Sequence, residues 1–177
     1  MTAPEYIQLK AFARIDGALL SLLFVAACVC YVVGLTSPTY GFLALLTVVL
    51  TPVFVGMRLK RFRDDGLEGK ISFLRAWFYV CLMFFYGGLL FALIQYAYLA
   101  YMDQGYMVSV ITEMFSSPEN AELIKKMGMA DQISESLHML QTMRPIDFAL
   151  DMLTSLIMAG MLLGMPIAAV MQKKVKR

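Results

Sequence analysis

Charged residues are scarce in this sequence and are absent from three long stretches. Only 16% of the 177 residues are Asp, Glu, Lys or Arg, while 60% are hydrophobic. No charge interrupts residues 17–57, 76–102 or 152–172. A membrane-spanning helix needs about 20 apolar residues. The composition therefore excludes a water-soluble domain, a disordered chain and a nucleic-acid-binding protein, which would need a basic face.

The residues that most often carry chemistry are few. The chain has three cysteines and one histidine. Cys28, Cys30 and Cys81 fall within apolar stretches, where thiols behave as small hydrophobic groups. No nucleophile–base pair, phosphate-binding glycine loop or zinc-ligand spacing is present. The sequence therefore predicts a protein without catalytic residues, cofactor or metal.

The apolar stretches predict four transmembrane helices. The first stretch is long enough for two spans, and Pro38 interrupts it because proline lacks an N–H and disfavours helix in its predecessor. Strands would leave backbone groups unpaired in lipid, so the spans must be helical. We expect an all-α bundle of four membrane helices, with a basic loop at 58–72, a helical segment at 103–145, and spans at about 15–35, 40–57, 73–102 and 146–171.

The first span also resembles a signal peptide, since basic residues precede an apolar run that contains Cys28. Two features favour a retained span. Asp16 abuts the run, and the residues after Cys28 stay apolar where a cleaved lipoprotein would have a polar tether. We therefore expect the first span to remain in the protein.

The basic residues predict the orientation of the bundle. The N-terminus, the 58–72 loop with its flanks and the C-terminus together carry 12 of the 15 Lys and Arg residues. Such residues collect on the cytoplasmic side. We therefore expect both termini in the cytoplasm. Trp77 and Tyr79, at the cytoplasmic end of the third span, fit an aromatic belt at the level of the lipid headgroups.

The 103–145 segment has a helical pattern of its own. Apolar residues recur three and four positions apart, and Pro118 and Gly128 divide the segment into short helices. We expect a small amphipathic cap on the outer side of the membrane, with its apolar face on the lipid surface or on the ends of the spans.

Four polar residues are candidates for function, each with a structural alternative. Asp147 and Asp151 lie one turn apart and could hold a cation, although acidic residues at a helix start more often stabilise the helix dipole. Asp16 could serve transport, but an ion pair with an arginine of the loop is the simpler interpretation. Gln95 lies deep in an uncharged run and is expected to hydrogen-bond a neighbouring helix rather than a substrate.

The other candidates concern metal binding, packing and lipid. His138 stands on the outer segment without a second metal ligand, so a metal site is not expected. Gly160 and Gly164 form a small-xxx-small motif that lets another helix approach, within the chain or in a dimer. The basic cluster is expected to set orientation and contact anionic lipid headgroups; its members are Arg58, Lys60, Arg61 and Arg63.

The pattern as a whole resembles the bacterial membrane family catalogued as domain of unknown function 4199. The resemblance rests on Ala13-Arg14-Ile15-Asp16-Gly17, on Gly69-Lys70-Ile71-Ser72-Phe73 and on Tyr98-Leu99-Ala100-Tyr101-Met102-Asp103. It implies a four-span protein of the bacterial inner membrane. It also implies an accessory role, beside a membrane-associated glycosyltransferase in particular, and it assigns no functional residue.

Three functions are compatible with the sequence. We expect a non-catalytic accessory or scaffold subunit that binds the lipid bilayer and either a membrane protein partner or another copy of itself. A small transporter or channel protomer is the alternative, although no charged residue lies deep in a span. The third is an intramembrane enzyme acting on lipid, for which Asp147, Asp151 and His138 are the available groups.

Overall fold

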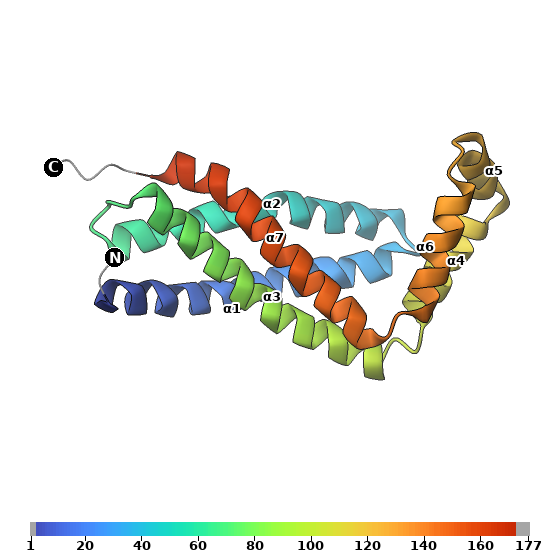
Figure 1. Ribbon diagram of the computed structural model, residues 1–177, viewed down its shortest axis with the longest axis horizontal. Helices are drawn as coiled ribbons and strands as arrows, with labels where there is room; N and C mark the ends of the chain where they lie inside the picture. Colours follow the sequence, from blue (N-terminus) through green and yellow to red (C-terminus); the bar gives the residue numbers. More distant parts are fainter. Residues whose placement is uncertain (1–2, 173–177) are drawn as a thin grey trace.

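The computed structural model describes residues 3–172, in which the regular elements are helices (Figure 1). Four of them are long and apolar enough to cross a membrane. Three short helices stand between the third and the fourth. The chain is therefore an all-α, multi-pass membrane protein, as the sequence predicts. The four long helices are α1 (Ala3–Gly34), α2 (Pro38–Gly66), α3 (Phe73–Tyr101) and α7 (Pro145–Met171).

The long helices form a bundle in which α1 packs against α2 and α3, and α3 packs against α7 (Figure 1). Contact between α2 and α7 is less extensive. Helix α1 begins and α7 ends at the same end of the bundle, which we call the basic end (Figure 1). The short helices lie at the opposite end, called here the cap end, and run across the bundle rather than along it.

Two of the helices are longer than the sequence predicts. Helix α1 begins at Ala3, and α2 continues to Gly66 through the basic stretch expected to be a loop. Only residues 67–72 connect α2 to α3. The stretch is helical because Val55, Leu59 and Phe62 repeat at spacings of four and three and are buried as one face of α2.

The side chains pack most tightly at the basic end. Two glycines allow α1 and α3 to cross closely, since a Cβ on Gly17 would lie 2.9 Å from the Met83 carbonyl oxygen and one on Gly87 2.9 Å from that of Gly17. The apolar residues with no exposed surface lie on all four long helices, mostly toward this end. They are Leu9, Ala13, Leu20, Val55, Leu59, Phe62, Ala76, Tyr79, Val80, Met83 and Ala168.

The cap end consists of α4 (Tyr106–Ser116), α5 (Pro118–Lys126) and α6 (Ala130–Thr142). Gly105 precedes α4 with φ of 83° and Gly128 separates α5 from α6 with φ of 69°, a left-handed conformation that glycine adopts without strain. The breaks at Pro118 and Gly128 match the sequence prediction. No residue of these three helices is buried.

A cavity of about 730 Å³ separates the cap helices from the ends of the long helices. Leu99 and Phe148 line it from α3 and α7, while Val108 and Leu140 line it from α4 and α6. Of the two positions expected for the apolar cap face, the span ends or the lipid surface, the described residues show only loose packing on the span ends. The cap is open on its apolar side.

Candidate functional site

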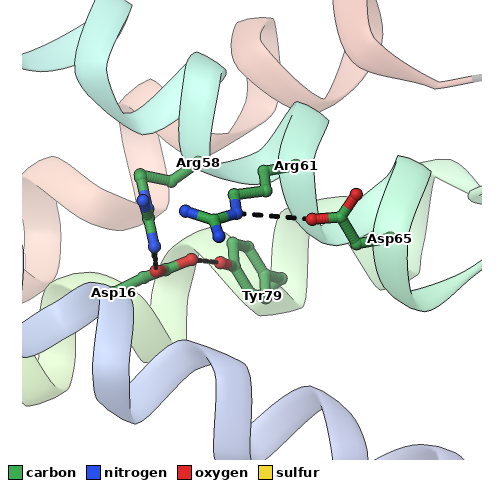
Figure 2. A network of polar contacts seen from close by, with 5 residues as sticks. All are labelled: Asp16, Arg58, Arg61, Asp65 and Tyr79. Carbon is green, nitrogen blue, oxygen red and sulfur yellow. Dashed lines mark hydrogen bonds and ion pairs between the residues drawn. The ribbon is translucent and has the colours of Figure 1, made fainter.

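The most enclosed charged group among the described residues is the carboxylate of Asp16, which is 2% exposed. Arg58 on α2 donates from Nε to Asp16 Oδ1 at 2.8 Å, and its Nη2 donates to the same oxygen. On α3, the Tyr79 hydroxyl donates to Asp16 Oδ2 (Figure 2). One carboxylate therefore joins three long helices at the basic end of the bundle.

The local sequence explains why these side chains meet. Asp16 follows Leu9 and Ala13 and precedes Leu20 in a series spaced by four, three and four residues, so it belongs to the buried stripe of α1. Its partner Tyr79 stacks on Phe62, with ring centroids 4.5 Å apart and ring planes 2° from parallel. Aromatic packing thus holds the tyrosine hydroxyl against the carboxylate.

The arrangement is suited to positioning helices. Charges inside a membrane protein are normally paired, because an unpaired charge in a medium of low dielectric is costly. Asp16 and Arg58 neutralise each other, and Tyr79 occupies the second carboxylate oxygen. Among residues 3–172, no group of three His, Cys, Asp or Glu side chains gathers as a metal site would. The network fixes how α1, α2 and α3 lie together.

A second set of polar contacts closes the basic end. Arg63 is 6% exposed, pairs with Asp64 at 2.8 Å, and donates from Nη1 to the Met171 carbonyl oxygen at 3.1 Å. This hydrogen bond joins the end of α2 to the end of α7. Gln8 donates to the Gly66 carbonyl oxygen at 3.1 Å and so joins α1 to the end of α2.

These contacts correct two expectations. Arg58 and Arg63 bond within the bundle, so Lys60 and Arg61 are the members of the basic cluster that are exposed toward lipid headgroups. The reason is that α2 continues through the cluster and divides its residues between two faces. Tyr79 is likewise no member of an interfacial belt, because its ring is fully buried against Phe62.

The two candidate carboxylates of α7 have different surroundings. Asp147 accepts hydrogen bonds from the Arg144 backbone N–H at 3.1 Å and from the Arg144 Nε at 2.9 Å. This is a capping arrangement at the start of the helix. Asp151 is exposed one turn later. Asp147 is therefore engaged by Arg144 at the start of α7, where an acidic residue also interacts favourably with the helix dipole.

The remaining candidates lie apart from the Asp16 network. Gln95 is 8% exposed, and its Oε1 has no hydrogen-bond partner among the described residues. His138 is exposed on α6. Gly160 and Gly164 pack within the chain, since a Cβ at Gly160 would lie 2.5 Å from the Phe84 Cβ. A Cβ at Gly164 would lie 3.0 Å from the Trp77 ring.

The sequence does not identify three residues with structural roles, of which two belong to the Asp16 network and one lies before α4. Tyr79 and Phe62 were not singled out as partners of Asp16, although the helical spacing places each on a buried face of its helix. Asp103 was also missed. It is 6% exposed, and its carboxylate accepts the Met107 N–H at 3.2 Å at the start of α4.

Comparison with known proteins places this fold in a family. The family model described as "Protein of unknown function (DUF4199)" matches residues 15–173. The chain belongs to this family. No curated protein and no solved structure was found to match it. The match includes Asp16, Arg58 and Tyr79, so the network lies within the region that the family model covers.

Proposed function

We propose that this DUF4199 chain is a non-catalytic accessory or scaffold subunit that binds a membrane protein partner through its cap helices. The observation that carries the proposal is the exposure of apolar side chains on these helices. Leu123 is 57% exposed, Met127 71% and Met139 61%. A patterned apolar surface that the chain itself does not cover is typical of a binding surface.

The energetic cost of the cap supports this proposal. Ordering a residue costs about 1–2 kcal/mol of backbone entropy, and a short turn would suffice to join α3 to α7. Burial within the chain offsets only part of this cost, because no residue of α4, α5 or α6 is fully buried. A partner surface would supply the missing burial. Methionine suits such a surface because its flexible side chain adapts to irregular contacts.

We further propose a location and an orientation. The distribution of basic residues supports an orientation with both termini in the cytoplasm and the cap on the outer side. The family resemblance implies the bacterial inner membrane as the location. The family resemblance makes a membrane-associated glycosyltransferase the partner to test first.

Cysteine labelling tests the orientation. In a chain lacking Cys28, Cys30 and Cys81, a single cysteine at Gly66 is expected to resist a membrane-impermeant thiol reagent in intact spheroplasts. A single cysteine at Gln132 is expected to react. Both positions are to be labelled after membrane lysis, as the control for accessibility. Labelling of Gly66 but not Gln132 in intact cells would reverse the proposed orientation.

Replacement of the cap tests the function. With a short Gly/Ser linker in place of residues 105–142, the four long helices are expected to insert and pack, because α4–α6 contribute no buried residue to the bundle. The partner is expected to be lost from affinity purifications in mild detergent. A truncated protein that keeps its partner would contradict the proposal, and one that cannot assemble would show that the cap belongs to the core.

Point variants sharpen this test. Leu123→Glu combined with Met127→Glu places two charges on the exposed apolar surface and is expected to abolish partner association. Gln132→Glu adds a charge at an exposed polar position of the cap and is the matched control, expected to associate normally. Purification of a homo-oligomer without any other protein would favour the channel-protomer alternative.

A further inference from the structure

A second cavity, of about 570 Å³, opens at the basic end between the start of α1 and the start of α3. The residues that line it combine two aromatic rings, one exposed aliphatic side chain and three polar groups. They are Glu5, Tyr6, Ser72, Leu74, Arg75 and Phe78.

Arg75 is the principal cation of this cavity, and its hydrogen-bonding capacity is only partly used. Its Nη1 pairs with Glu5 Oε1 at 3.2 Å. Its Nε and Nη2 are buried and have no hydrogen-bond partner among the described residues. Those two nitrogens form one edge of the planar guanidinium, with two parallel N–H groups. Such an edge fits two oxygens of a single phosphate or carboxylate group.

The surroundings of Arg75 favour an amphiphilic ligand over a small soluble anion. Leu74 is 67% exposed at the rim of the cavity, where it would face acyl chains. Tyr6 and Phe78 stand with ring centroids 6.2 Å apart and supply an apolar wall. Lys10 adds a second positive charge nearby, with its Nζ 6.0 Å from the centre of the Tyr6 ring. Basic pockets of this kind at helix ends suit lipid headgroups.

We propose that this cavity binds the headgroup phosphate of an anionic phospholipid and that Arg75 is the residue that recognises it. The Nε–Nη2 edge is covered in the structure, so binding requires the guanidinium to turn this edge into the cavity that the same side chain lines. The phosphate then accepts both N–H groups, while the acyl chains follow Leu74 along the outside of α3.

The proposal is tested by the binding of a fluorescent phosphatidylglycerol to the purified full chain in a neutral detergent. Arg75→Gln is expected to weaken binding about tenfold or more, as the loss of charge-assisted hydrogen bonds does. Arg75→Lys is expected to weaken it as well, because lysine has no two-donor edge. Arg14→Gln removes the same charge from an exposed position of α1 outside the cavity and is expected to bind like the parent.

Phosphatidylcholine and inorganic phosphate distinguish the sources of the phosphate group. The choline lipid is expected to bind more weakly, and an excess of inorganic phosphate is expected not to displace phosphatidylglycerol. Displacement by inorganic phosphate would show a site for a soluble anion and would overturn the proposal. Equal weakening by Arg75→Gln and Arg14→Gln would also overturn it, because binding would then follow general charge.

A second pair of variants keeps the test decisive if Arg75→Gln does not fold. Ser72→Phe fills the cavity from its exposed rim and leaves Arg75 in place, so it is expected to weaken lipid binding. Ser72→Ala leaves the cavity open and is expected to bind normally. Unchanged binding by Ser72→Phe would show that the lipid does not occupy this cavity.

Discussion

The apolar faces of amphipathic helices are buried at the basic end of this molecule and largely exposed at the cap end. At the basic end, the apolar faces of α1 and α2 are buried against each other and against α3, and even the charged Asp16 and Arg63 are enclosed. At the cap end, α4, α5 and α6 have apolar faces with no buried residue. The apolar faces of the first region are covered within the chain, whereas those of the second keep much of their surface exposed.

The solvent explains part of this difference. In lipid, apolar side chains gain little by leaving the acyl chains, so helix association depends on close packing and polar contacts. Leu9 and Phe62 have polar or charged neighbours in the sequence, where water drives their burial as in a soluble core. The same force acts on the apolar faces of the cap helices. Their exposure is therefore unfavourable in water, and a partner or a lipid surface would relieve it.

The largest expected effect of a substitution lies in the Asp16 network. Asp16→Ala leaves Arg58 enclosed without its partner, and the loss of one member of a buried pair costs about 3–5 kcal/mol. We expect a correspondingly large fall in the thermal unfolding temperature in detergent. Asp65→Ala is the matched control because it breaks the exposed Arg61–Asp65 pair, at 3.3 Å, for less than about 0.5 kcal/mol. Equal effects would contradict the contrast between interior and surface pairs.

A smaller effect is expected where α1 crosses α3. Gly17→Ala would place a Cβ 2.9 Å from the Met83 carbonyl oxygen, and such overpacking costs about 1–3 kcal/mol. Gly41→Ala is the control, because the added Cβ would lie 3.8 Å from the nearest atom, the Gly34 carbonyl oxygen. Thermal unfolding of the two variants measures the difference. A Gly17→Ala protein as stable as the parent would show that the crossing is looser than the structure indicates.

The smallest effect is expected at the start of α7. Asp147→Asn combined with Asp151→Asn should insert and unfold much like the parent, since both side chains lie toward the surface and asparagine can still accept hydrogen bonds from Arg144. Membrane fractionation and thermal unfolding are the measurements. If the double variant inserts normally but no longer associates with its partner, the capping interpretation is insufficient, and cation binding or catalysis by these carboxylates must be considered.

The sequence predicts the spans better than it predicts their ends. Charge-free stretches locate all four long helices, and Pro38, Pro118 and Gly128 mark real breaks. The charges after Met57 predict a loop where the structure has helix, because charge alone does not distinguish a loop from the exposed face of a helix. The buried apolar residues of this stretch are spaced by four and three positions, and this spacing predicts the helix that a count of charges does not.

The site was only partly predictable for a different reason. An arginine partner for Asp16 follows from the cost of a lone carboxylate next to an apolar run. Which arginine it is, and that Tyr79 completes the network, depends on the rotation of three helices about their axes. Local spacing fixes the buried face of each helix but not which faces meet. Those contacts arise from tertiary packing, for which the close approach at Gly17 and Gly87 is decisive.

The hydrogen bond from Arg63 to the Met171 carbonyl oxygen has a consequence for biosynthesis. Its two ends are separated by 108 positions, and the acceptor lies in the last turn of the last membrane helix. During translation, α1, α2 and α3 can assemble around Asp16 as soon as they emerge. The guanidinium of Arg63 finds this acceptor only after α7 has been synthesised and inserted. Until then Arg63 is paired with Asp64 on its own helix, so the hydrogen bond that closes the basic end of the bundle is made last.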